Sequence, residues 1–232
     1  MDVLVVDIGG SRVKLKVSNG NEVRRFESGP DLTPQTTVAR VQELTADWRF
    51  DAISIGYPGT VNANGPSAEP GNLGCGWVEF DFEAALGKPV RVVNDAVLQA
   101  LGGYEGGRML FLGLGTGVGS ALVTEHVVVP LELGCLTWKD ATVWDWLGRD
   151  ALKAHGVDEW SRDVAGVTAM LREACVADYV LLGGGNAHKV KPLPDGTRLG
   201  GNEHAFDGGY RLWEEMVEPH DRPSPPVWRV VR

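Results

Sequence analysis

The sequence predicts an α/β protein with two lobes, each of which combines a mixed β-sheet with helices. The order of elements supports this prediction, because strands, a helix, a further strand and a long loop are followed by much the same order from about residue 108. Both halves open on an apolar strand that ends in glycine, VVDIGG in the first half and LFLGLG in the second. With 43% hydrophobic and 23% charged residues, the 232-residue chain has enough apolar content for one large domain or two small lobes.

The N-terminal half predicts an antiparallel meander of three strands and then alternating helices and strands. Residues 3–9, 12–18 and 22–28 read as short strands separated by the turn signals GGS and NGN. Thr33 followed by Pro34 is typical of a helix start, and apolar residues follow at helical spacing. The further elements expected are a doubly buried strand at 52–59, a long loop at 58–77, a helix at 81–87, a strand at 90–95 and a helix at 96–104.

The C-terminal half predicts a hairpin, a helical stretch and a final buried strand. Apolar strands at 108–114 and 119–125 flank a glycine-rich turn. The elements expected after this hairpin are helices at 143–156 and 161–177, a strand at 179–185 that runs into glycine, a helix at 202–216 and a loose tail.

Glycine clusters follow three of the apolar strands. Glycine inside a strand costs roughly 0.5–1 kcal/mol of stability relative to alanine, so its repeated use indicates a ligand or a turn that requires a backbone without side chains. Exposed N–H groups in a glycine turn point together at an anion, although a tight hairpin alone would also explain the stretch 110–123. Three such turns are better explained by parts of a nucleotide or polyphosphate that converge on one cleft. The residues we expect to bind phosphate are Gly9, Gly10 and Ser11, then Gly115, Thr116 and Gly117, and finally Gly183, Gly184 and Gly185.

Two charged side chains accompany the first glycine turn. Asp7 lies at the tip of a buried strand beside the expected phosphate site, where a carboxylate can hold Mg²⁺ through water. Its structural alternative is a turn-capping aspartate that accepts from the N–H groups of Gly9 or Gly10. Lys14, four residues after Gly10 on the next strand, either reaches phosphate or is an exposed strand lysine.

Composition excludes several kinds of partner. The formal net charge of −9 argues against nucleic acid and anionic membranes. No apolar run is long enough to span a bilayer, and the first residues read as a strand, so we expect a cytoplasmic protein. Cys75, Cys135 and Cys175 form no C-x-x-C pair, which favours reduced thiols over disulfides or structural zinc. The eight tryptophans fit either a core or a dimer face, and a homodimer stays open.

Seven motifs, in order, resemble the ROK (repressor, open reading frame, kinase) sugar kinases of the actin and hexokinase-like ATPase superfamily. They are DIGGSRVK, GYPGTV, GNLGCGW, GKPVRVVNDAV, LGTGVGSAL, PLELG and LLGGGNA, and the resemblance is strongest to short bacterial polyphosphate glucokinase-like proteins. It implies an α/β, actin/hexokinase-like (ribonuclease H-like) fold with a mixed sheet in each lobe and a cleft between the lobes. We expect an N-terminal lobe at 1–104, completed by the helix 203–216, a C-terminal lobe at 105–202 and a tail at 217–232.

The resemblance also implies an activity and a set of site residues. It implies a kinase that uses Mg²⁺ and transfers a phosphoryl group from ATP or polyphosphate to a hexose hydroxyl, with glucose as the default acceptor. Asp95 of VVND is then the general base, which fits the need of phosphoryl transfer for a carboxylate that accepts the hydroxyl proton. Asn72, Asn94 and Glu132 would bind sugar hydroxyls. The structural alternatives are a helix N-cap for Asn94 or Asp95, a turn position for Asn72 and a solvated strand end for Glu132.

The chain departs from the family at the acceptor and donor sites. Cys135 stands where the family has a histidine after ELG, and the zinc-binding cysteine segment is missing, so we expect no zinc. A thiol is a poor hydrogen-bonding substitute, which makes phosphoryl transfer better supported than glucose. The residues 188–191 and Arg198 are a candidate basic track for polyphosphate or an ordinary solvated face, and both donors stay open. A non-catalytic sugar sensor on the same scaffold is the alternative function.

Overall fold

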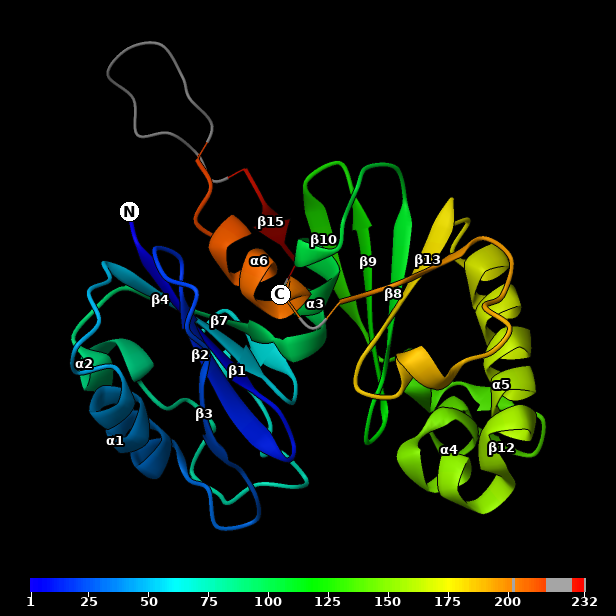
Figure 1. Ribbon diagram of the computed structural model, residues 1–232, viewed down its shortest axis with the longest axis horizontal. Coiled ribbons are helices and arrows are strands. Elements are labelled where there is room, and N and C mark those ends of the chain that lie inside the picture. Colours follow the sequence, from blue (N-terminus) through cyan, green and yellow to red (C-terminus); the bar gives the residue numbers. More distant parts are fainter. Residues whose placement is uncertain (202, 216–226, 232) are drawn as a thin grey trace.

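The computed structural model describes residues 1–201, 203–215 and 227–231 (Figure 1). Its first sheet has five strands in the order β3-β2-β1-β4-β7. These are β1 Val3–Ile8, β2 Arg12–Val17, β3 Arg24–Glu27, β4 Ala52–Tyr57 and β7 Val90–Asn94. The strands β1, β2 and β3 pair antiparallel, which confirms the predicted meander, whereas β4 and β7 continue the sheet in parallel. All six residues of β4 are buried, as expected for a strand covered on both faces.

The second sheet has six strands in the order β14-β13-β8-β9-β10-β15. These are β8 Met109–Leu114, β9 Val118–Thr124, β10 Val127–Leu131, β13 Tyr179–Gly183, β14 Thr197–Leu199 and β15 Arg229–Val230. The glycine-rich stretch is the turn of the β8–β9 hairpin, which closes with Leu114 opposite Val118. Strand β13 runs parallel to β8 and places Gly183 beside Gly113. The sheet is therefore mixed, like the first one.

The described end of the chain corrects the prediction of a loose tail. Arg229 and Val230 form β15, which pairs in parallel with Val127 and Val128 of β10. Trp228 is buried, and its indole N–H donates to Glu214 at 2.9 Å. The short strand escaped the sequence analysis because it has only two residues and follows a proline-rich stretch. Residues 217–226 and 232 of the predicted tail lie outside the described residues.

The helices form three layers around the two sheets (Figure 1). They are α1 Pro34–Leu44, α2 Phe82–Leu86, α3 Asp95–Gly102, α4 Val143–Leu147, α5 Arg149–Ala174 and α6 His204–Arg211. Helices α1 and α2 pack on the outer face of the first sheet, and α4 and α5 pack on the outer face of the second. Helices α3 and α6 lie between the sheets. In the described residues, no helix is both long and apolar enough to cross a membrane.

Short elements complete the fold. They are the ribbon β5 Val61–Asn62 with β6 Gly65–Pro66, the ribbon β11 Thr137–Trp138 with β12 Ala141–Thr142, and the 3-10 turns Leu133–Cys135 and Ala187–Lys189. The first ribbon belongs to the long loop predicted at 58–77. Helix α1 begins as predicted, because Thr33 accepts from the Thr36 N–H and Thr36 returns a bond to the Thr33 N–H.

A buried core between the sheets joins the two halves of the chain. It includes Val5 from β1, Phe111 from β8 and Phe206 from α6. Helix α6 comes from the C-terminal half of the sequence, yet it contacts β1 and β4 of the first sheet, and Ser54 on β4 donates to the Gly209 carbonyl at 2.6 Å. This return of the chain supports the proposed division into a lobe of 1–104 with 203–216 and a lobe of 105–202.

Glycine allows the two central helices to touch backbone to backbone. A Cβ at Gly208 would overlap the carbonyl oxygen of Leu98, and one at Gly102 would overlap the carbonyl oxygen of His204. On the next position of α6, a Cβ at Gly209 would overlap the side chain of Val5 on β1. The two glycines inside α6 therefore do not break the helix but set its distance from α3 and from the first sheet.

We predict that Gly208→Ala destabilises the protein by about 3 kcal/mol or more, because neither backbone can give way to the new methyl group. Thermal unfolding followed by circular dichroism would measure the loss as a fall in Tm of several degrees. Gly29→Ala is the matched control, since a Cβ there meets nothing within 4 Å. An equal Tm for both variants would contradict the proposed backbone contact.

Candidate active site

The three glycine turns meet at one place. A Cβ at Gly10 would lie 3.6 Å from the Thr116 hydroxyl oxygen, which brings the first and second turns together. A Cβ at Gly184 would lie 2.6 Å from the Leu114 carbonyl oxygen, which brings the third turn against the second. The second and third turns are neighbours because β8 and β13 are parallel and end at the same edge of the sheet. The turns therefore converge, as the sequence analysis expected.

In each turn one N–H is hydrogen-bonded within the protein and another is not. The N–H of Gly9 donates to Arg12 at 3.0 Å, that of Gly115 to Gly117 at 3.0 Å, and that of Gly184 to the Gln99 side chain at 3.2 Å. Within the described residues, the N–H groups of Gly10, Thr116 and Gly185 have no protein acceptor. Three unpaired N–H groups on converging turns are suited to phosphate oxygens.

Asn72 reaches this place from the long loop. Its side-chain amide covers Gly10 so closely that a Cβ there would overlap the Asn72 nitrogen. The loop is held in place by the fully buried Trp77, whose indole donates to the Gly74 carbonyl at 2.8 Å. Glu69 braces the same stretch by accepting from the N–H groups of Gly76 and Trp77. Asn72 is therefore placed by a structured loop beside the first glycine turn.

The structure shows which of Asn94 and Asp95 caps helix α3. Asn94 is the N-cap of α3, since its side-chain oxygen accepts from the Ala96 N–H at 2.9 Å. Its amide nitrogen donates to the Gly59 carbonyl at 3.0 Å. Asp95, the first residue of the helix, also accepts from the Ala96 N–H, at 2.8 Å. The cap is thus provided by Asn94, and the structural role proposed for Asp95 is not required.

The carboxylates around Asp95 strongly perturb its ionisation. Burial, together with the nearby charges of Asp7 and Glu132, raises the pKa of Asp95 to about 7 against the opposing hydrogen bond from the Ala96 N–H. Asp7 is 7% exposed, and burial raises its pKa, whereas Lys14 at 3.5 Å lowers it. The interactions of Asp95 with Asp7 and Glu132 indicate that the three carboxylates share one site, at the meeting point of the two sheets.

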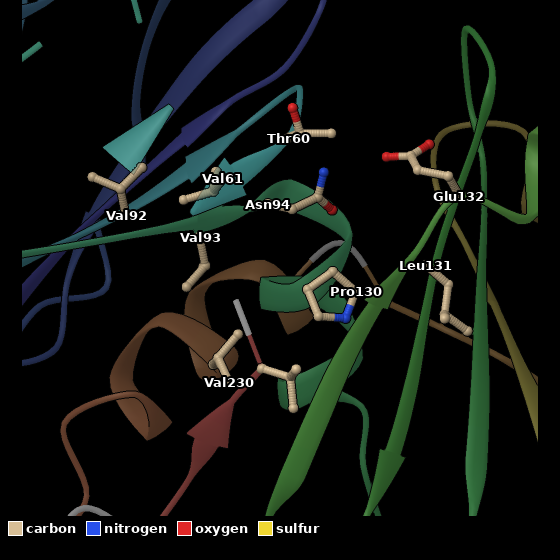
Figure 2. Close-up of a pocket in the computed structure, with 10 residues that line it drawn as sticks. Thr60, Val61, Val92, Val93, Asn94, Pro130, Leu131, Glu132 and Val230 are labelled. Atoms are coloured by element: carbon tan, nitrogen blue, oxygen red, sulfur yellow. The ribbon is translucent and has the colours of Figure 1, made fainter. Parts of the chain in front are cut away.

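Glu132 comes to the site from the second sheet. It follows β10, makes no side-chain cap to the short turn Leu133–Cys135, and its carboxylate points toward the side of Asn94 and Thr60 (Figure 2). Partial burial raises its pKa. Cys135 is exposed on that same turn, and its N–H donates to the Glu132 carbonyl at 3.1 Å. The carboxylate is thus available to a ligand between the lobes.

Two residues at the site were missed by the sequence analysis. Gln99 lies one helical turn after Asp95 and accepts from the third glycine turn. The half-exposed ring of Trp144 covers Gly117 and contacts Gly134, so no side chain could replace Gly117 without moving it. The spacing of four residues between Asp95 and Gln99 predicts a shared helix face. The contacts themselves depend on tertiary packing.

Two cations of the candidate basic track have partners within the protein. Lys189 donates to the Asn186 side chain at 2.9 Å, and the Asn186 amide donates to the Gly115 carbonyl of the second glycine turn at 3.3 Å. Arg198 forms an ion pair with Glu105 at 2.5 Å, and its guanidinium lies 4.0 Å from the centre of the Tyr179 ring. The choice between a basic track and a solvated face, and between the two donors, stays open.

We predict that Asp95→Asn makes the protein more stable at pH 8, although it removes a native side chain. The free aspartate pKa is about 3.9, so the folded protein binds the Asp95 proton more tightly and its stability falls as the pH rises from about 4 to 7. Asparagine carries no charge and so avoids this loss. We expect it to raise the free energy of unfolding by on the order of 1–3 kcal/mol at pH 8 and to change it little below pH 4.

Denaturant unfolding at the two pH values measures this difference. The control Asp150→Asn, at a fully exposed position of α5, should change stability by less than about 0.5 kcal/mol at either pH. A loss of stability at pH 8 for Asp95→Asn would show that the aspartate has a structural role instead.

Comparisons with known proteins place these observations in context. No family model matches the chain. Over 138 residues it is 31% identical to the bifunctional enzyme NanE/NanK of Brucella melitensis biotype 1, a match covering 52% of this chain and 26% of the relative. Over 220 residues it is 22% identical to a polyphosphate glucokinase of Mycobacterium tuberculosis, covering 80% of this chain and 78% of the relative. The match to the first of these relatives spans about a quarter of its length.

Solved structures share the fold over almost the whole chain. An inorganic polyphosphate/ATP-glucomannokinase from Arthrobacter sp. strain KM aligns with a TM-score of 0.78 and 23% identity, covering 90% of this chain and 96% of that one. A ROK family glucokinase from Streptomyces griseus, in complex with glucose and AMPPNP, aligns with a TM-score of 0.70 and 15% identity, covering 91% and 99%. The predicted two-lobed fold is confirmed.

Proposed function

We propose that this chain, whose sequence relatives and structural neighbours are ROK-family sugar kinases, is itself a sugar kinase that transfers a phosphoryl group from ATP or polyphosphate to a hydroxyl of a hexose. The observation that carries the proposal is Asp95. It is a carboxylate of pKa about 7 at the start of α3, and its ionisation responds to the charges of Asp7, two residues before the first glycine turn, and of Glu132. An aspartate with only a structural role would not need a pKa raised by burial and by two other carboxylates.

The proposed mechanism gives each group one task. Asp95 accepts the proton of the acceptor hydroxyl while that oxygen attacks the terminal phosphorus of the donor and the bond to the leaving phosphate breaks. A base with a pKa near 7 is matched to this step at neutral pH. Asn72, Asn94 and Glu132 hold the other hydroxyls, because amides and carboxylates satisfy groups that both donate and accept.

The glycine turns are proposed to bind the donor. The free N–H groups of Gly10, Thr116 and Gly185 would donate to phosphate oxygens, with Gly9, Ser11, Gly115, Gly117, Gly183 and Gly184 shaping the turns around them. Lys14 stands half-exposed at the same edge and forms an ion pair with Asp7. Backbone donors of this kind are preorganised, so they cost little reorganisation when charge develops on the transferring group.

The residues present fit Mg²⁺. Among the described residues there is no group of three or more His, Cys, Asp or Glu side chains that could hold a metal ion. Mg²⁺ does not require one, because it keeps several waters and uses one or two carboxylates together with substrate phosphates. Asp7, buried beside the first turn, would hold the ion through water. When bound, Mg²⁺ neutralises the charge of the donor phosphates.

We predict that the purified chain with Mg²⁺ phosphorylates at least one hexose or amino sugar, and that Asp95→Asn lowers kcat by about 10²–10⁴-fold because the base is lost. The assay offers ATP and polyphosphate separately, so it also identifies the donor. For the unmodified chain kcat/KM should rise between pH 6 and 8 as Asp95 loses its proton. Asp150→Asn should keep the full rate. Sugar binding without turnover for every pair would favour the sensor.

A second prediction concerns the donor turn. Gln99→Ala removes the acceptor that holds the Gly184 N–H, so we expect the donor KM to rise about fivefold while the acceptor KM changes little. Steady-state kinetics with each substrate varied in turn measure the two constants. Gln42→Ala, which removes an exposed bond to the Ala85 carbonyl, is the control. An equal rise in both constants would argue against a specific role at the donor turn.

A further inference from the structure

A half-exposed tryptophan lies between the proposed donor and acceptor sites. Trp144, on α4, is 49% exposed, and in the described part of the chain no other Phe, Tyr or Trp is exposed as much. A Cβ at Gly117 would lie 2.1–2.3 Å from three carbon atoms of its six-membered ring, so this ring lies directly against the second glycine turn. A Cβ at Gly134, two residues after Glu132, would lie 3.5 Å from the same side chain. Trp144 thus joins the turn proposed for phosphate to the turn that follows a proposed sugar ligand.

The position of Trp144 is fixed by the protein itself. Thr142 and Asp145 form a capping box at the start of α4, in which the Thr142 hydroxyl accepts from the Asp145 N–H at 3.1 Å. Directly after α4, the Arg149 N–H donates to the Thr116 carbonyl of the second glycine turn at 3.2 Å. The helix is therefore tied to this turn, and the ring stands on a rigid backbone.

Contacts connect the same ring to the first sheet. A Cβ at Gly10 would lie 2.3 Å from the Asn72 amide nitrogen and 3.6 Å from the Thr116 hydroxyl oxygen. Thr116 belongs to the turn that Trp144 covers. A continuous series of contacts therefore runs from Asn72 through the first two glycine turns to Trp144, and from there to the turn after Glu132.

A pyranose ring needs two kinds of partner. Its hydroxyls, on the rim, suit amides and carboxylates, whereas the C–H groups on its faces are apolar and suit the negative face of an aromatic ring. A nucleobase would also stack on tryptophan. It lies, however, at the far end of the triphosphate from the phosphoryl group that is transferred, whereas Trp144 lies against a turn proposed for phosphate and beside the turn after Glu132. This position favours the acceptor over the nucleobase.

We propose that Trp144 is a specificity-determining residue for the acceptor, and that the sugar ring packs a face of C–H groups against its indole. The proposal rests on the proposed kinase function and deepens it, because it describes the acceptor as a pyranose with one face free of axial hydroxyls. It also bears on the exposed thiol of Cys135, on the turn that Trp144 contacts. Where a weak hydrogen-bonding group lines the site, packing supplies the affinity.

The test compares Trp144→Phe with Trp144→Leu, because both side chains still cover Gly117 but only phenylalanine keeps an aromatic face. Calorimetry of the full chain without donor measures the Kd for glucose, mannose, galactose and allose. For the sugar that binds most tightly, we expect Kd to rise about tenfold in Trp144→Leu and no more than about threefold in Trp144→Phe. The donor KM should be the same in both variants.

The four sugars also identify the stacked face. Relative to glucose, allose carries an axial hydroxyl on one face of the ring, and mannose and galactose carry one on the other face. We expect the axial hydroxyls of one face only to weaken binding to the unmodified chain. This discrimination should shrink in Trp144→Leu and persist in Trp144→Phe, a pattern that a merely structural role of the side chain would not produce.

Trp48→Ala is the control. Trp48 is a partly exposed tryptophan of the first lobe that stacks with Arg24, and its loss should leave the sugar Kd unchanged. A circular dichroism melt checks that each variant folds.

The outcomes separate this proposal from the kinase function. Equal sugar Kd values in the two Trp144 variants, or no sugar binding by the unmodified chain, overturn the proposal. A change confined to the KM for ATP would show that the ring stacks on the nucleobase, and would overturn it as well. Sugar binding that depends on the aromatic face, in a chain that phosphorylates no sugar, would support the role of Trp144 and overturn the kinase.

Discussion

The contact between α3 and α6 is the constraint on which the rest of the structure depends. Gly102 and Gly208 let the two helix backbones touch, and Gly209 brings α6 equally close to Val5 of the first sheet. The two helices thereby fill a layer between the sheets that is thinner than ordinary side chains would allow. Because Asp95 is the first residue of α3, the same contact sets the position of the proposed base relative to both sheets.

Charge in the site follows from this arrangement. Asp7 lies near the end of a strand of the first sheet, Asp95 begins the central helix and Glu132 follows a strand of the second sheet, so Asp95 is affected by two carboxylates from distant parts of the chain. Burial and the repulsion from these two charges favour a proton on Asp95 at a pH where a free aspartate would be ionised. Unpaired N–H groups on the glycine turns offer the compensating positive dipoles, which an anionic donor could use.

The N-terminal part of α3 carries three residues of the proposed site. Asn94 caps the helix and ties it to the loop at Gly59, Asp95 follows directly, and Gln99 one turn later holds the third glycine turn. The helix therefore connects the proposed acceptor side with the proposed donor side through its own rigid backbone.

The sequence by itself determined the local features. Glycine clusters after apolar strands predicted the three turns, and Thr33 and Pro34 predicted the start of α1, because these signals depend on neighbouring residues. The ordered motifs predicted the two-lobed fold through their resemblance to a kinase family. Only the tertiary structure decided which of Asn94 and Asp95 caps the helix, that Gln99 reaches Gly184, and that Val230 joins the second sheet. The last two depend on contacts between residues far apart in the sequence, 85 positions for Gln99 and Gly184, and no local pattern records such contacts. The cap depends on how the Asn94 side chain is oriented at the start of α3.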